Sequence, residues 1–304
     1  MTGWPIGGGI VDPFVVLKSH PALADVPMPR EALRDQESLR VWPSTDLAGY
    51  LFRKDPGREA REAAARDLGA WLANLDRWQI ARAQVPVPAS APDEVFEQLT
   101  EHRDRVFLTV RLDPHQGMTG VRRLRWLADR YPGVRSVSLT PHMTYPLIAP
   151  DSREYYPVYA ACVELELAVF VNVGFPGPRV PARAQDPIHL DEVCWFFPEL
   201  TVVMRHGGEP WIDTCVKMLL RWPNLYYATT AFAPRYYPAP IIDLLNTRGR
   251  DKVIWAGYWP MLGYERLSAE LSALPVKAED GPAFLRDNAC RAFRLPGTGS
   301  LEVP

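Results

Sequence analysis

Short apolar runs alternate along the chain with stretches whose apolar residues recur at helical spacing. Eight runs rich in β-branched and aromatic residues have the length and composition of strands buried on both faces. These runs are residues 9–16, 80–87, 106–112, 134–140, 168–173, 200–204, 225–230 and 252–256. Helical periodicity predicts helices over residues 57–77, 93–103, 118–131, 157–167, 188–197, 211–221, 238–246, 264–273 and 284–293. The alternation predicts a parallel sheet, because parallel strands need crossover connections.

Eight strand–helix repeats are the number that closes a (β/α)8 barrel, and such a barrel accounts for 304 residues as one domain. The stretch from about residue 18 to 56 fits no repeat, and its weak patterning predicts an insertion with a short helix. The sequence therefore predicts an α/β fold, a distorted TIM barrel formed by residues 1–304 with a small N-terminal insertion.

Composition indicates a globular protein rather than a membrane or nucleic-acid-binding protein. An apolar fraction of 47% with 23% charged residues is ordinary for a globular protein, and a net charge of −2 gives no electrostatic reason to expect nucleic acid. The chain shows neither a signal-peptide pattern nor an apolar run of 18 residues, so we expect a soluble, cytoplasmic protein without a membrane partner. Four widely spaced cysteines lie in predicted helices, which predicts reduced, buried thiols: Cys162, Cys194, Cys215 and Cys290.

The segment LTVVMRHGGEPW, residues 200–211, joins a buried strand to a polar turn. His206 comes directly after the strand and before Gly207, and barrel enzymes place reactive groups at the carboxyl ends of strands. A histidine bonded to a loop carbonyl would look the same in the sequence. Because side chains alternate along a strand, Arg205 is predicted to point away from the space inside the barrel if His206 points into it.

A barrel would bring the carboxyl ends of the other strands to the same mouth. The polar and aromatic residues there are Asp12, Phe14, Gln84, Arg111, Asp113, His115, Thr140, His142, Asn172, Glu209, Thr229, Thr230, Tyr258 and Trp259. This set predicts an aromatic pocket with a few converging polar groups, as is usual for small-molecule sites.

Four segments resemble one known family: HLDEVCWFFPELTVVMRHGGEPW, WPNLYYATTAFAPRYYP, DKVIWAGYWPM and FLRDNACRAFRL. Their order and spacing are similar to the second half of the amidohydrolase-2 family, which includes aminocarboxymuconate-semialdehyde decarboxylase and aromatic-acid decarboxylases. The resemblance covers about residues 157–295 well and extends more weakly to the start of the chain. It implies a distorted TIM barrel, in agreement with the strand pattern, and a homodimer.

The resemblance also implies a metal site, from which this sequence departs. The family uses a His-x-His on strand one, a histidine ending strands five and six, and an aspartate ending strand eight. The matching positions here are Phe14, Val16, Asn172, His206 and Tyr258. Four of the five therefore bind divalent metals poorly or not at all, so we predict no metal there and no cofactor. A different metal site remains open on His115, His142 and Asp113.

Without a metal, the remaining groups suit proton transfer and hydrogen bonding. The ordinary pKa of histidine, about 6.5, suits His206 to act as acid or base. Tyr258 and Asn172 are predicted to stabilise oxyanion charge, and Asp12 to orient an imidazole or balance a positive group. The pyrone-dicarboxylate lactonase of the family is metal-independent, which implies that the barrel can work without the ion, although that enzyme uses the strand-eight aspartate replaced here.

The predicted substrate is a small or medium organic molecule with carbonyl or aromatic character. The predicted reaction is hydrolysis, decarboxylation, or proton-transfer elimination or cyclisation. The residues predicted to bind the substrate are Phe14, Arg111, His142, Trp255, Trp259, Phe232 and Arg235, with the arginines pairing a carboxylate or enolate. Two alternatives remain open: a metal-dependent decarboxylase or hydrolase of the family, and a non-catalytic barrel kept for ligand binding or as a subunit of an assembly.

Overall fold

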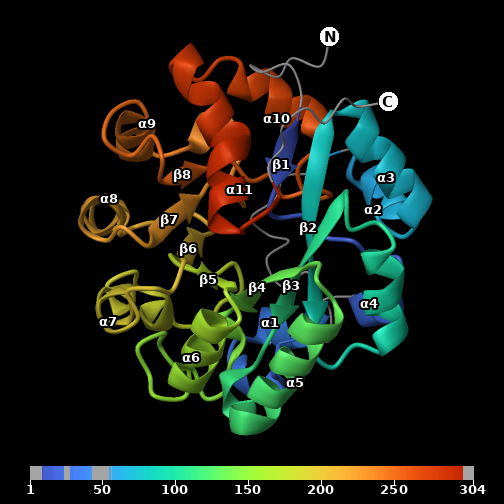
Figure 1. The fold of residues 1–304 in the computed structure, drawn as a ribbon, viewed down its shortest axis with the longest axis vertical. Coiled ribbons are helices and arrows are strands. Elements are labelled where there is room, and N and C mark those ends of the chain that lie inside the picture. The colour runs from blue at the N-terminus through green and yellow to red at the C-terminus, as the bar shows by residue number, and fades with distance from the viewer. Residues whose placement is uncertain (1–8, 24–27, 43–54, 56, 297–304) are drawn as a thin grey trace.

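Eight parallel strands form one sheet whose spatial order follows the chain. The computed structural model describes residues 9–23, 28–42, 55 and 57–296. Figure 1 shows the strands in a curved row at the centre, with helices α3 to α9 outside them. The strands are β1 Ile10–Asp12, β2 Ile80–Pro88, β3 Val106–Arg111, β4 Val134–Leu139, β5 Ala168–Asn172, β6 Val202–Arg205, β7 Leu225–Ala228 and β8 Val253–Ile254. The predicted TIM barrel is confirmed.

Helices follow the strands as predicted, with two differences. They are α1 Gln36–Val41, α2 Arg58–Ala64, α3 Leu68–Arg77, α4 Asp93–Thr100, α5 Gly117–Arg130, α6 Tyr156–Glu164, α7 His189–Phe196, α8 Ile212–Arg221, α9 Ala239–Leu245, α10 Tyr264–Leu271 and α11 Asn288–Ala292. The single helix predicted over 57–77 is split, because Asp67 caps α3 by accepting a hydrogen bond from the Ala70 amide at 2.7 Å. The helix predicted over 284–293 begins with a π-helical turn before α11.

Two apolar layers hold the barrel together. The larger lies between strands and helices, and the smaller fills the space enclosed by the strands, here called the lumen. Phe293, directly after α11, lies 5.6 Å between ring centroids from both Phe107 and Phe170. Since Phe107 is at the start of β3, α11 covers the amino ends of the strands. The candidate functional site lies at the opposite, carboxyl ends of the strands.

The barrel closes between β1 and β8 through a buried carboxylate. Asp12 accepts a hydrogen bond from the Gly257 amide at 2.9 Å and another from the Tyr264 hydroxyl at 2.9 Å. The Val16 amide donates to the Trp259 carbonyl at 2.9 Å just beyond it. A side chain at Gly257 would collide with the Asp12 carboxylate. This seam therefore depends on a close approach of the two chain segments.

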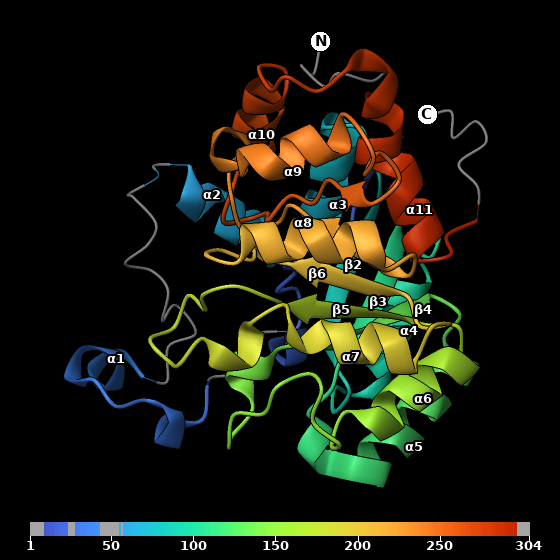
Figure 2. The same ribbon diagram turned by 90° about the vertical axis from the view of Figure 1, so that its left-hand side faces the viewer.

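The insertion packs against the carboxyl end of the barrel. Its helix α1 lies to one side of the strands, confirming the predicted short helix (Figure 2). Leu33 shares a small apolar cluster with Met143, which follows β4, and Val180, which follows β5. Residues 24–27, 43–54 and 56 of the predicted insertion lie outside the described residues.

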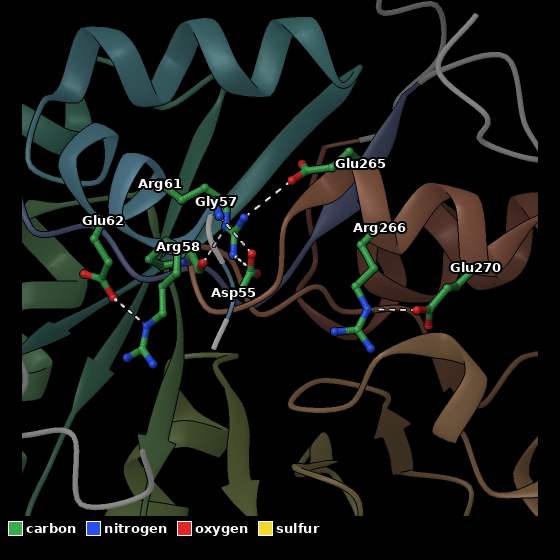
Figure 3. A network of polar contacts seen from close by, with 9 residues as sticks. Asp55, Gly57, Arg58, Arg61, Glu62, Glu265, Arg266 and Glu270 are labelled. Atoms are coloured by element: carbon green, nitrogen blue, oxygen red, sulfur yellow. Dashed lines mark hydrogen bonds and ion pairs between the residues drawn. The ribbon is translucent and has the colours of Figure 1, made fainter. Parts of the chain in front are cut away.

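A polar network joins α2 to the loop that follows β8 (Figure 3). Arg61 donates through Nε to the Pro260 carbonyl at 2.8 Å and lies 3.4 Å from the Glu265 carboxylate. It also pairs with Asp55. This loop carries Tyr258, so the network anchors one side of the mouth.

The cysteines lie where the helical pattern places them. Cys162, Cys194 and Cys215 are buried thiols, and Cys290 is partly exposed. In the part of the chain that the structure describes, no helix combines the length and the apolarity needed to cross a membrane.

Candidate active site in the barrel lumen

His206 stands at the end of β6 in a strained backbone turn. Its φ of 70° lies in the left-handed region, which non-glycine residues rarely adopt, and Gly207 continues the turn with a φ of 94°. A Cβ at Gly207 would collide with the ring of Phe232. The turn brings the imidazole edge-on to Phe14, 4.9 Å between centroids, and 5.5 Å from the ring of Tyr258. Two of the predicted neighbours therefore contact His206.

Arg205 also points into the lumen, so the prediction that it points away was wrong. Its guanidinium lies over the ring of Phe170 at 4.6 Å and over Phe14 at 5.0 Å, and the residue is 2% exposed. Alternation holds within β6, because Val203 belongs to the same inner cluster. The left-handed turn at His206 then interrupts the alternation, and two consecutive side chains share the lumen.

A polar layer from three adjacent strands supports this guanidinium. Nε of Arg205 donates to Oδ1 of Asn172, its register partner on β5, and Nη2 donates to Oγ of Ser138 on β4 at 2.7 Å. Nη1 is buried and has no hydrogen-bond partner among the described residues. Buried charged donors are nearly always paired, so Nη1 marks a place where a ligand can supply an acceptor.

His142, which follows β4, is held by Gln185. Its Nδ1 lies 2.6 Å from Oε1 of Gln185, whose Nε2 donates to the Gly174 carbonyl at 2.7 Å. The amide nitrogen of Gln185 is thus used, its oxygen is the acceptor, and Nδ1 carries the proton. Burial lowers the pKa of His142 to about 4, with the charge of Arg205 acting in the same direction.

His206 is neutral at physiological pH for the same physical reasons. Burial, then the charges of Arg205 and His142, hold its pKa well below the ordinary value. Its Nδ1 is buried and has no hydrogen-bond partner among the described residues. The ring is therefore a neutral imidazole with an available nitrogen.

Positive charge predominates at this mouth. Burial, together with the charge of nearby Arg111, lowers the pKa of Arg205 to about 9, so Arg205 remains charged at pH 7. Arg111 ends β3 and is partly exposed. Among the described residues, no carboxylate forms an ion pair with Arg205.

Asp12 lies at the seam rather than among these groups. Its Oδ1 also accepts from the Phe14 amide at 3.0 Å, so it fixes the residue whose ring lies against His206. Burial raises its pKa to about 6, and its hydrogen bonds oppose that rise.

Three residues predicted to bind substrate lie elsewhere. Trp255 is fully buried in the layer between strands and helices, because its neighbours Ile254 and Ala256 face the lumen. Trp259 stacks on Tyr264 in the same outer layer. Arg235 lies on the surface, where its Nε is 3.6 Å from Glu270.

The structure brings together Phe14, Arg111, His142, Asn172, His206 and Tyr258 around Arg205. Sequence reasoning missed Arg205, Ser138 and Gln185 as parts of the site. Strand residues 134–139, VRSVSL, carried one signal: Ser136 and Ser138 place hydroxyls on a single face of a buried strand. Gln185 comes from a long loop, and no pattern in the sequence marks it.

The donor set does not fit a divalent metal. The described residues contain no group of three or more His, Cys, Asp or Glu side chains that could hold one. At the mouth, the oxygen of Asn172 already accepts from Arg205, whose charge would repel a cation. The alternative metal site is not assembled either, because His115 pairs with Asp113 at 2.9 Å in a partly exposed turn while His142 is bonded to Gln185.

Comparison with known proteins gives the family. A family model described as amidohydrolase matches residues 41–295. The chain belongs to the amidohydrolase family. This confirms the resemblance seen in the sequence, and the family supports an enzyme of hydrolase or lyase type. A search of curated proteins gives no match.

Solved structures share the fold of this amidohydrolase. An uncharacterised TIM-barrel protein from Bordetella bronchiseptica is 21% identical with a TM-score of 0.71, covering 94% of this chain and 98% of its own. A 5-carboxyvanillate decarboxylase from Novosphingobium aromaticivorans, with bound manganese, is 15% identical with a TM-score of 0.67, covering 95% and 98%. A 2,6-dihydroxybenzoate decarboxylase from Rhizobium is 15% identical with a TM-score of 0.64, covering 95% and 100%. At these identities the likeness is one of fold.

Proposed function

We propose that this amidohydrolase is a metal-independent enzyme acting on a small or medium organic molecule with carbonyl or aromatic character. The reaction is hydrolysis, decarboxylation, or proton-transfer elimination or cyclisation. The observation that carries the proposal is the neutral imidazole of His206, at a position where the family resemblance expects a metal ligand, beside the fixed guanidinium of Arg205. Its Nδ1 is buried and has no hydrogen-bond partner among the described residues. Decarboxylases among the proteins of the same fold support this class of chemistry.

His206 moves the proton in this proposal. Its imidazole is neutral and can accept a proton from the substrate or from a substrate-bound water, then return it to the product. An imidazolium next to Arg205 is unfavourable on its own. It becomes favourable when negative charge develops on a substrate held between them, so proton transfer is coupled to occupancy of the site.

Tyr258 and Asn172 stabilise the developing negative charge. The ring of Tyr258 stacks on Phe14 at 5.4 Å, which fixes it beside His206 so that its hydroxyl can donate to an oxyanion. Because the oxygen of Asn172 accepts from Arg205, its amide nitrogen is the atom left to donate. Asp12 acts as a positioning residue through its hydrogen bond to the Phe14 amide.

A non-catalytic barrel is the second candidate, and one observation favours it. Among the described residues, the charge of Arg205 lowers the pKa of both His142 and His206, and no carboxylate acts to raise the pKa of either. Such a site can bind an anion without turning it over. A metal-dependent decarboxylase is disfavoured by the donor set described above.

The proposal is tested by turnover of a panel of organic acids and esters, including 2,6-dihydroxybenzoate and 5-carboxyvanillate, with a chelator present. We expect His206→Asn to lower turnover by about 10²-fold or more, since general acid–base catalysis contributes that much. Asparagine is chosen because it tolerates the left-handed backbone of residue 206. Product formation is followed by chromatography and mass spectrometry.

The matched control is Arg235→Met, a surface arginine whose loss should leave turnover unchanged. Tyr258→Phe should show a smaller loss than His206→Asn. If both His206→Asn and Tyr258→Phe retain wild-type turnover, these residues do not perform the chemistry, and the proposed mechanism falls.

A further inference from the structure

We infer that Arg205, with Arg111 beside it, binds the carboxylate of an organic acid, and that organic acids are the substrate class of this enzyme. That the bound acid is a substrate rests on the proposed function, whereas binding of a carboxylate to Arg205 can be measured without turnover. Arg205 thereby becomes a specificity-determining residue whose fixed charge lies among the positions where relatives are expected to hold a metal.

Positive groups at this site are not balanced by negative ones in the described part of the chain. Two guanidinium groups lie near enough for Arg111 to lower the pKa of Arg205. The charge of Arg205 likewise lowers the pKa of His142 and of His206. Carboxylates are missing from the groups that shift these three residues in the described part of the chain. A buried charge without a counter-charge is costly unless a ligand supplies it.

Arg205 has one donor group that its hydrogen bonds leave unused among the described residues. Nε and Nη2 are fixed by Asn172 and Ser138, which leaves Nη1 buried and without a partner. The guanidinium also lies over the rings of both Phe14 and Phe170, and these contacts together with its two hydrogen bonds hold its orientation. A prearranged donor of this kind suits a planar oxyanion, because carboxylates accept charge-assisted hydrogen bonds from guanidinium groups.

Aromatic rings surround the guanidinium of Arg205. It lies over the rings of Phe14 and Phe170. The ring of Phe14 in turn contacts the rings of Tyr258 and His206. Aromatic walls around the cationic site favour an acid with an apolar or aromatic body over a small, strongly hydrated inorganic anion.

The experiment compares benzoate with its neutral analogue benzamide, using calorimetric titration and thermal unfolding of the full chain. We expect benzoate to bind and to raise the melting temperature, as a ligand of the folded state must, and benzamide to have little effect. Arg205→Met should weaken benzoate binding about tenfold or more, because a charged hydrogen bond is lost. Arg235→Met, at the surface, should bind benzoate like the wild type.

Two further variants cover the case in which Arg205→Met fails to fold. Arg111→Met, at the partly exposed rim, should weaken benzoate binding, and Arg205→Lys should give an intermediate loss because it keeps charge without the planar fork. Equal effects of benzoate and benzamide, or unchanged benzoate affinity in these variants, would overturn the inference. Inorganic phosphate that binds as tightly as benzoate, and displaces it, would overturn the assignment to organic acids.

The two proposals fail in different ways. His206→Asn should retain benzoate binding while losing turnover. If benzoate does not bind and His206→Asn still abolishes turnover of the panel, only the carboxylate site is wrong. If benzoate binds through Arg205 and His206→Asn leaves turnover unchanged, only the acid–base role is wrong.

Discussion

At the scale of single residues, two consecutive side chains share the lumen because the backbone of His206 is left-handed. A strand alone would direct Arg205 and His206 to opposite faces. Backbone strain of this kind costs about 1–3 kcal/mol and is typical of functional sites. It places His206 beside the guanidinium of Arg205, and burial together with that charge keeps His206 and His142 neutral.

The neutral state of His142 predicts a loss of stability in acid. Its folded-state pKa is about 4, whereas an unfolded histidine has the ordinary value of 6.5. As pH falls below 6.5 the unfolded chain gains a proton that the folded chain does not, so the free energy of unfolding decreases down to about pH 4. His142 should lower the free energy of unfolding of the wild type by about 2 kcal/mol at pH 5 relative to pH 7.5. His142→Asn, whose side-chain amide can replace the Nδ1 donor to Gln185, should not show this decrease.

Urea unfolding of the wild type and His142→Asn at both pH values measures this difference. The variant serves as its own control for other titrating groups, since these are common to both proteins. If the difference in unfolding free energy between the two proteins is the same at pH 5 and pH 7.5, His142 is not held neutral in the folded state.

At the scale of elements, periodicity predicted the strands and most helices, but not how the barrel closes. The alternation of β8 was visible in the sequence: with Ile254 and Ala256 facing inward, Trp255 must face the helices. The closure at Asp12 was not visible, because it depends on an approach to Gly257 across 245 residues. The left-handed turn after β6 could not be predicted either. Gly207 and Gly208 indicate a turn, but they do not determine the φ of the preceding residue, His206.

Asp12, at the seam between β1 and β8, predicts a pH dependence of stability opposite to that of His142. Burial raises the pKa of Asp12 to about 6, above its ordinary value of 3.8. The folded chain therefore holds a proton between these values that the unfolded chain has lost, and the contribution of Asp12 to stability falls as pH rises from about 4 to above 6. Asp12→Asn keeps an oxygen acceptor for the Gly257 and Phe14 amides without the charge.

Relative to the wild type, Asp12→Asn should gain roughly 2–3 kcal/mol of unfolding free energy between pH 4 and pH 7. Chemical denaturation across this range measures it, and Asp213→Asn, an acidic position near the amino end of α8, controls for general effects of removing a carboxylate. A difference between Asp12→Asn and wild type that does not change with pH would contradict the raised pKa.

At the scale of the whole molecule, the candidate site lies on one face of the barrel, at the carboxyl ends of the strands. The amino ends of the strands are covered by α11, and the insertion, the polar network of Arg61 and the strand ends meet at the carboxyl side. Family membership and fold were predictable because they rest on patterns repeated along the chain. The composition of the site was only half predictable, because the departure from the family's metal-ligand pattern is visible in the sequence, while the position of the Arg205 guanidinium in the lumen depends on where side chains point.

We propose that this amidohydrolase works without a metal, with Arg205 supplying the positive charge of the site. Inductively coupled plasma mass spectrometry of the purified full chain, paired with turnover before and after chelation, tests this proposal most directly. We expect far less than one Zn, Mn or Fe per chain and turnover unchanged by the chelator. About one equivalent of a single metal per chain, with turnover lost on chelation and restored by that metal, would contradict it.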